Sequence, residues 1–193
     1  RFGETENNVV HTLSRPSENS AYNISQEDLV VAALRFDPDV VVVGEIRDAE
    51  ANSTVEASLT GHTVVTTVHS GPAESAHGRI SLLCQRRFQL GMEVSLSQSR
   101  QAFPIVVFAH KCEDNSRKVM DITECEVTPE GKTYYRCLYR YNITENIYDG
   151  NKFTIKGEFE KVNTPSEYLK TLLTRSGVPQ DELSKFTRKE MTE

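Results

Sequence analysis

The sequence predicts an α/β fold that gives way to antiparallel β-structure after residue 102, and three observations carry this prediction. Residues 40–43 are four consecutive valines, a β-branched run that is too short for a helix and apolar on both faces, as in a buried parallel strand. A helical interval and a second strand pattern at 63–68 follow, which fits a right-handed crossover. From Phe103 onward, alternating β-rich segments favour an antiparallel meander. We therefore divide the chain into residues 1–102 and 103–193.

Composition limits the classes of partner. The 193 residues suffice to bury the core of one domain, or of a domain with an appendage. A net charge of −6 argues against nucleic acid as a direct partner. No apolar run approaches the ~20 residues of a membrane helix, and the first residues lack a signal-peptide pattern. Four cysteines without a C-x-x-C pair favour buried thiols in a reducing compartment. We expect a cytosolic protein.

The first segments lead into a helix. Residues 8–13 form a short strand candidate, followed by a polar loop. Ser25 is placed to cap a helix with an apolar stripe, and Asp37-Pro38-Asp39 ends that helix before the valine run. Arg35 lies near the helix end, where a cation complements the helix dipole.

Polar residues gather where the two predicted parallel strands end. Gly44 permits a sharp turn, and Glu45, Arg47 and Asp48 follow at once. Asp48 is placed to cap a helix at 49–59, which Gly61 ends. The strand at 63–68 leads into His69. Because parallel neighbours present their carboxyl ends at one sheet edge, Glu45 and His69 are expected to face one ligand.

The remaining elements follow from composition and turn residues. Helices are expected at 73–90 and 93–102, with His77 and the arginines, Arg79 and Arg100 among them, on a solvated face. Strands are expected at 104–109, 118–127, 133–141 and 152–155, and helices at 164–175, capped by Thr164, and at 179–189. Gly131-Lys132-Thr133 copies the end of a phosphate-binding loop, but Glu126 occupies the place of its first glycine. We interpret it as a hairpin turn.

Two strings resemble a known family. Leu34 to Asp48 resembles the Walker B segment of the secretion ATPase superfamily, the hexameric motors of type II and type IV secretion and of type IV pili. Thr60-Gly61-His62 with Thr66-Thr67-Val68-His69 resembles the histidine box of that superfamily. The meander from Asp114 to Cys125 is similar to the Flp, or tight-adherence, pilus branch. The resemblance implies the C-terminal part of a RecA-like P-loop NTPase core, with a small β-meander and C-terminal helices.

The resemblance also implies a function for the intact protein. Such motors hydrolyse ATP with Mg²⁺ as homo-hexamers, at the cytoplasmic face of the membrane and beneath an inner-membrane platform protein. Their phosphate-binding loop lies upstream of the Walker B segment, and the 193 residues do not contain one. We therefore expect this chain alone not to bind ATP. The alternative is a non-catalytic ring or scaffold subunit that keeps the fold without nucleotide binding.

Five residues are candidates for the reaction, and the resemblance assigns the role of Glu45. Glu45 would polarise the attacking water, and His69 would contact the terminal phosphate or the water. Arg47 would orient Glu45, pair with Asp48 or Glu50, or contact phosphate. Arg35 is a candidate for a nucleotide contact, and His62 is a candidate for a nucleotide contact, a subunit contact or structural packing. His62 lies seven residues from His69, about 23 Å along an extended strand. The two histidines then cannot share a ligand atom, which disfavours a zinc site and leaves a metal hydrolase without enough ligands.

Overall fold

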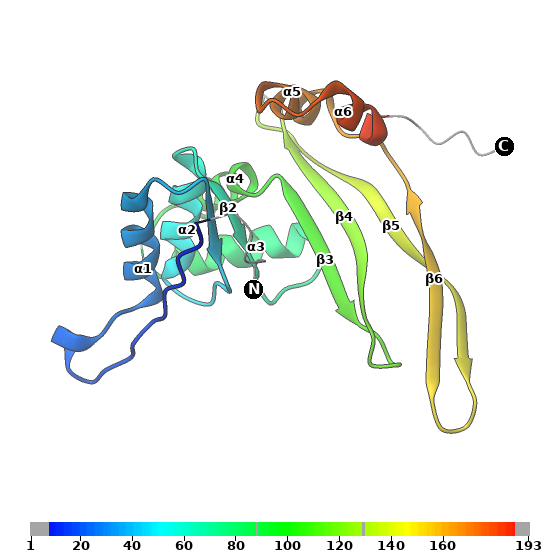
Figure 1. Ribbon diagram of the computed structural model, residues 1–193, viewed down its shortest axis with the longest axis horizontal. Helices are drawn as coiled ribbons and strands as arrows, with labels where there is room; N and C mark the ends of the chain where they lie inside the picture. The colour runs from blue at the N-terminus through cyan, green and yellow to red at the C-terminus, as the bar shows by residue number, and fades with distance from the viewer. Residues whose placement is uncertain (1–7, 88, 129, 188–193) are drawn as a thin grey trace.

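The computed structural model describes residues 8–87, 89–128 and 130–187. Helices pack against one face of a two-stranded parallel sheet, and a four-stranded antiparallel sheet with two terminal helices lies beside them (Figure 1). The predicted α/β class with a β-meander and C-terminal helices is confirmed. The change to antiparallel structure falls between α4, which ends at Ala102, and β3, which begins at Ile105.

The chain enters the fold through α1, Gln26–Ala33, which continues as the 3₁₀ helix η2, Leu34–Phe36. Ser25 and Asp28 form a capping box that satisfies amides at the helix start, so the predicted cap is confirmed. The predicted strand at 8–13 is wrong, because these residues have no regular structure and are exposed. They are followed by the short 3₁₀ helix η1, Ser20–Tyr22.

The valine run forms β1, Val40–Val43, which pairs in parallel with β2, Thr63–Thr66, as predicted. Val41 and Val43 are buried in the core. Val40 and Val42 are 50% and 48% exposed, so burial on both faces is wrong for the described part of the chain. The described helices cover one face of this sheet.

Three further helices pack with α1 around the core on the covered face of the parallel sheet: α2, Glu50–Leu59; α3, Ala73–Cys84; and α4, Met92–Ala102. Gly61 ends the α2 segment with a φ of 106°, and the amide of His62 donates to the carbonyl of Ala57 at 3.2 Å. The predicted end of the third helix at Leu90 is wrong, since α3 stops at Cys84. None of the helices among the described residues is long and apolar enough to cross a membrane.

His77 and Arg100 join the helices to the antiparallel sheet. The His77 side chain is fully buried; its Nε2 donates to the carbonyl of Phe103 at 2.9 Å, and its Nδ1 lies 3.2 Å from the Tyr135 hydroxyl. Burial lowers the pKa of His77. Arg100 donates from Nε to the same hydroxyl at 3.3 Å. The prediction of a solvated face is therefore wrong for both residues.

The antiparallel sheet has the order β3-β4-β5-β6. Its strands are β3, Ile105–Lys111; β4, Arg117–Val127; β5, Thr133–Tyr148; and β6, Phe153–Lys161. Gly131 turns between β4 and β5 with a φ of 79°, which confirms the hairpin interpretation. Both β5 and β6 are longer than predicted, and their hairpin projects from the body (Figure 1).

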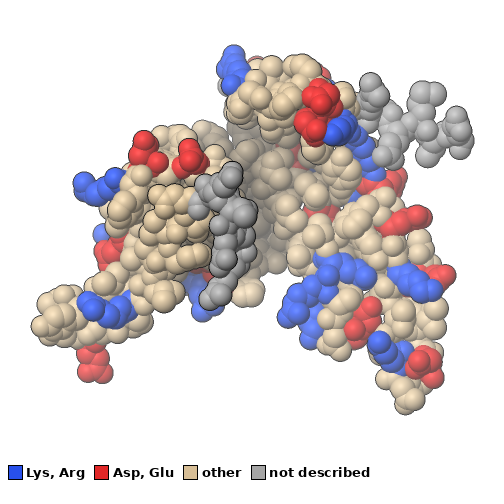
Figure 2. All heavy atoms as spheres, viewed as in Figure 1, with Lys and Arg blue, Asp and Glu red and all other residues tan. Residues whose placement is uncertain are grey.

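Basic side chains gather near the free end of the β3–β4 hairpin on the face that Figure 2 shows. In the register there, Lys111 lies opposite Arg117 and His110 opposite Lys118. This local patch does not change the net acidity of the chain.

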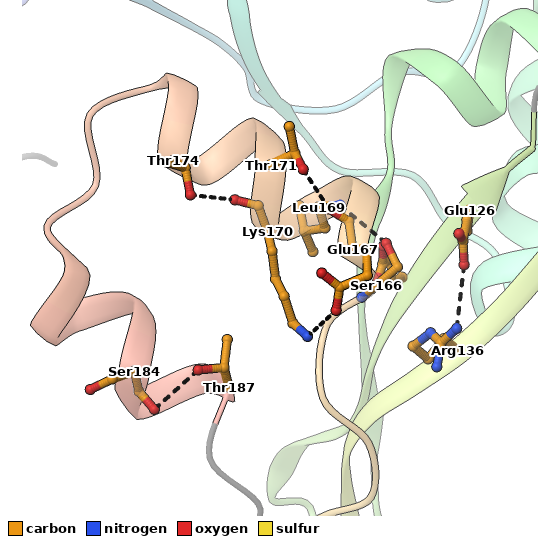
Figure 3. Close-up of polar contacts among 11 residues, drawn as sticks. Glu126, Arg136, Ser166, Glu167, Leu169, Lys170, Thr171, Thr174, Ser184 and Thr187 are labelled. Atoms are coloured by element: carbon orange, nitrogen blue, oxygen red, sulfur yellow. Dashed lines mark hydrogen bonds and ion pairs between the residues drawn. The ribbon is translucent and has the colours of Figure 1, made fainter.

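The terminal helices are α5, Glu167–Arg175, and α6, Gln180–Thr187. Thr164 is not the cap of α5, because Ser166 accepts the amide of Leu169 at 3.1 Å (Figure 3). The buried Glu124 of β4 accepts hydrogen bonds from the Ser166 amide and hydroxyl, which fixes α5 to the sheet. The predicted last helix at 179–189 extends by two positions beyond the described residues.

Candidate active site

The loop after β1 is held by its neighbour strand and by α1. The amide of Ile46 donates to the carbonyl of Thr67 at 2.9 Å, and the Thr67 hydroxyl donates to the carbonyl of Gly44 at 2.7 Å. Gln26 of α1 donates from its side-chain amide to the carbonyl of Glu45 at 2.7 Å. Ile46 itself is 1% exposed and anchors the loop in the core. Its neighbour Glu45 is therefore carried on a fixed backbone.

Glu45 and His69 meet at the carboxyl ends of the two parallel strands. Nε2 of His69 lies 3.2 Å from Oε1 of Glu45, although the His69 side chain is 94% exposed. The contact is not aligned as a hydrogen bond, and Oε1 is buried without a hydrogen-bond partner among the described residues. This oxygen can accept a hydrogen bond from a ligand or a water molecule. The sheet edge thus brings together the acid and the histidine, as the topology requires.

Arg47 holds the other oxygen of Glu45. Its guanidinium donates to Oε2, while the Arg47 side chain remains 75% exposed. This hydrogen bond, followed by the charges of Arg47 and His69, lowers the pKa of Glu45 against the opposing effect of burial. Glu45 is therefore an ionised carboxylate near neutral pH, with one oxygen paired to Arg47.

Glu50, not Asp48, organises the start of α2. Oε1 of Glu50 accepts the amides of Arg47 at 2.5 Å and Asp48 at 3.0 Å, and Glu50 is 7% exposed. Asp48 instead forms an ion pair with Arg86 at 2.9 Å. The prediction of Asp48 as the helix cap is wrong, because its carboxylate pairs with Arg86, which lies in the turn after α3. Sequence reasoning missed Glu50, whose place in the first helical turn was the available signal.

A hollow of 220 Å³ opens at this sheet edge. It is lined by Glu45, Ile46, Arg47, Val68, His69 and Arg79. Arg79 is exposed, as expected, and it also lines the hollow because α3 begins just after the end of β2. The site therefore combines one carboxylate, one imidazole and two guanidinium groups.

Arg35 and His62 lie away from this hollow. Arg35 is in η2, before β1 begins, whereas Glu45 follows the carboxyl end of β1. His62 precedes β2, and its Nδ1 lies 3.2 Å from the carbonyl of Ala57. Neither residue lines the hollow, so a nucleotide contact by either would involve a different surface.

Comparison with known proteins identifies the family of this chain. The family described as Type II/IV secretion system protein matches residues 4–150. The chain belongs to this family. The resemblance to secretion ATPases is therefore confirmed, whereas the Flp branch stays a prediction.

Named relatives come from secretion, pilus and competence systems. Competence protein ComGA of Streptococcus pneumoniae is 41% identical over 146 residues, 75% of this chain and 42% of that protein. Type II secretion system protein E of Dickeya dadantii is 40% identical over 92 residues, 42% of this chain and 18% of that protein. Type IV pilus assembly ATPase TfpB of Acinetobacter baylyi is 44% identical over 63 residues, 32% of this chain and 11% of that protein. The chain spans less than half the length of each.

Two solved structures of ATPases are also similar in part. The match to the VirB11 ATPase of Brucella suis, in complex with sulphate, covers 52% of this chain and 32% of the VirB11 chain. The sequence identity is 21% and the TM-score is 0.49. The match to the DotB ATPase of Legionella pneumophila covers 88% of this chain and 35% of the DotB chain. The sequence identity is 20% and the TM-score is 0.39.

Proposed function

We propose that this chain carries the water-activating part of the ATPase centre in a secretion or pilus-assembly motor. The single observation that supports this most is Oε1 of Glu45, a buried oxygen without a hydrogen-bond partner among the described residues, 3.2 Å from His69. Family membership and a relative named as a pilus assembly ATPase support the same reaction class.

The residues at the hollow suit the phosphate end of ATP with Mg²⁺. Arg47 and Arg79 supply positive charge, and His69 supplies an exposed ring nitrogen donor or acceptor. A single carboxylate accords with Mg²⁺, which is usually bound through one or two carboxylates, substrate phosphates and water. Bound ATP with Mg²⁺ supplies the terminal phosphoryl group that water attacks.

Each residue then has a defined task. Glu45 accepts a hydrogen bond from the attacking water at Oε1 and orients it, and its lowered pKa keeps it unprotonated for this task. Arg47 fixes the carboxylate through Oε2, so that Oε1 stays available. His69 and Arg79 stabilise charge on the terminal phosphate.

The wider assembly is part of the proposal. The intact protein acts as a cytoplasmic homo-hexamer, peripheral to the membrane and beneath an inner-membrane platform protein, and it belongs to the Flp pilus branch. Arg35 and His62, which lie away from the hollow, contact nucleotide or a neighbouring subunit across the ring. The 193-residue chain alone does not bind ATP, because it contains no complete G-x-x-x-x-G-K-[ST] sequence.

The test compares ATP binding and steady-state hydrolysis in the protein expressed from its complete reading frame. Glu45→Gln keeps the size of the side chain and removes its charge, so hydrolysis should fall by about 100-fold or more while ATP binding persists. Glu93→Gln, at an exposed position in α4, is the matched control and should retain activity. Equal hydrolysis in both variants would refute the role of Glu45. Absence of ATP binding in the unmodified protein would support the scaffold alternative.

A further inference from the structure

A second hollow, of 530 Å³, lies along the first half of β5. Four consecutive residues, 134–137, line one side, and the connection after β6 lines the other with Val162 and Asn163. Successive residues of a strand point to opposite faces of the sheet. A hollow that touches four in a row therefore follows the edge of the strand and not one face.

This edge of β5 is open. Residues 133–140 of β5 pair with β4, but pairing with β6 begins only where Tyr139 lies opposite Lys161. Nearer β6, the amide of Val162 donates to the carbonyl of Leu138 at 2.9 Å, and the Asn163 side chain donates to the carbonyl of Cys137 at 2.8 Å. No strand in the described ranges pairs with residues 133–136 on that side. Such an edge is a template for an added strand.

The charges along the groove favour an acidic occupant. Arg136 and Arg140 both line it, against one carboxylate from Glu126. Arg136 points toward Glu126 on the neighbouring strand, with 3.4 Å between Nη2 of Arg136 and Oε2 of Glu126 (Figure 3). Nε of Arg136 is buried without a hydrogen-bond partner within the described part of the chain. A buried donor without an acceptor is unfavourable, and a second carboxylate would satisfy the guanidinium.

We propose that this edge groove, formed by residues 134–137, Arg140, Val162, Asn163 and Glu126, binds an extended acidic peptide segment of a partner protein. The segment adds to the open edge of β5 as a strand, and main-chain hydrogen bonds supply affinity that does not depend on its sequence. Arg136 and Arg140 select carboxylate side chains, and the half-exposed ring of Tyr134 flanks the segment. This binding is separate from the hollow at Glu45.

The test measures binding of short labelled peptides to the protein by fluorescence anisotropy. The probe is an acetylated peptide, Thr-Glu-Glu-Thr-Glu-Glu-Thr, which presents carboxylates on both faces of an extended strand. Its lysine counterpart, Thr-Lys-Lys-Thr-Lys-Lys-Thr, should not bind. Two further copies of the acidic peptide carry N-methyl groups on alternate backbone nitrogens, one copy in each phase. Only one of these two copies should lose binding, because every second amide of an added strand faces the sheet.

Variants of the protein test the arginines. Arg136→Met should weaken binding of the acidic peptide by at least about tenfold, since it removes charge-assisted hydrogen bonds. Arg140→Met, an independent variant should Arg136→Met fail to fold, should weaken binding in the same direction. Arg117→Met, an exposed arginine of the same sheet outside the groove, is the matched control and should bind normally. Glu45→Gln should also bind normally.

Three results would overturn the proposal. Equal binding of the acidic and lysine peptides would remove the role of charge. Equal binding of both N-methylated copies and the unmodified peptide, with inorganic phosphate as an effective competitor, would indicate an oxyanion site without strand addition. Unchanged affinity in both Arg136→Met and Arg140→Met would place the peptide elsewhere.

Discussion

Ser166→Ala should detach the C-terminal helices from the sheet. The Ser166 hydroxyl performs two tasks at once: it donates to Oε1 of Glu124, and it accepts the amide of Leu169 at 3.1 Å (Figure 3). Glu124 is 1% exposed, so water cannot easily replace the lost donor. The substitution therefore removes a helix cap and leaves a buried carboxylate oxygen short of a partner.

The magnitude follows from these two losses. Loss of a serine cap costs typically ~1 kcal/mol, and an unsatisfied buried acceptor costs about 1–3 kcal/mol, so the free energy of unfolding should fall by about 2–4 kcal/mol. The matched control is Thr171→Ala in the same helix, where an exposed hydroxyl donates to the carbonyl of Glu167. Its effect should be near zero, because alanine has the higher helix propensity.

Two measurements check this prediction. Urea unfolding gives the change in global stability, and hydrogen exchange of the amides in α5 shows whether that helix opens before the sheet. Ser166→Ala should raise exchange in α5 more than Thr171→Ala does. A loss of less than about 1 kcal/mol, with α5 exchanging as in the control, would refute the anchoring role of Glu124.

Four further predictions concern other parts of the fold. Burial lowers the pKa of His77 below its ordinary value of 6.5, so the unfolded chain binds a proton that the folded state excludes. Stability should therefore fall as the pH drops from about 7 through the folded pKa. The midpoint of urea unfolding should depend less on pH in His77→Gln than in the unmodified protein. A Cβ at Gly157 would lie 2.2 Å from the carbonyl oxygen of Asn142, so Gly157→Ala should lower the melting temperature. By contrast, Gly78→Ala, inside α3 with open space around it, should stabilise by about 0.5–1 kcal/mol. Arg79→Ala should weaken ATP binding by about tenfold in the protein expressed from its complete reading frame, measured by titration calorimetry.

Each of these predictions has a contrary result. An unchanged pH dependence in His77→Gln would mean that other groups govern stability in that range. Equal effects of the two glycine variants would contradict the close approach of β6 to β5 at Gly157. Normal ATP affinity in Arg79→Ala would place Arg79 outside the nucleotide site.

The sheet edge was predictable because its signals are local. A run of valines, a glycine turn and a helix ended by Gly61 are sufficient to order strand, helix and strand, and parallel pairing then brings Glu45 to His69. The exposed faces of Val40 and Val42 were not predictable in the same way, because burial of a second face depends on what covers it.

The errors arose where contacts between residues far apart in the sequence decide which residue caps a helix, is buried or joins a strand. Asp48 and Glu50 are both able to cap α2. The choice between them depends on Arg86, which lies 38 positions from Asp48 and forms a hydrogen bond with its carboxylate. The burial of His77 was missed because its partner Tyr135 lies 58 positions away, too far for a local sequence pattern to reveal the contact. The polar second half of β5 forms a strand because β6 pairs with it, with Tyr148 and Phe153 stacked at 4.6 Å.

The most direct test of the proposed function isolates the chemical step. Pre-bound ATP would be followed through a single turnover in the protein expressed from its complete reading frame, with and without Glu45→Gln. We predict that Glu45→Gln slows cleavage of the terminal phosphate by about 100-fold or more while the bound fraction of ATP stays the same. Cleavage at the unmodified rate in Glu45→Gln would contradict the claim that Glu45 orients the attacking water.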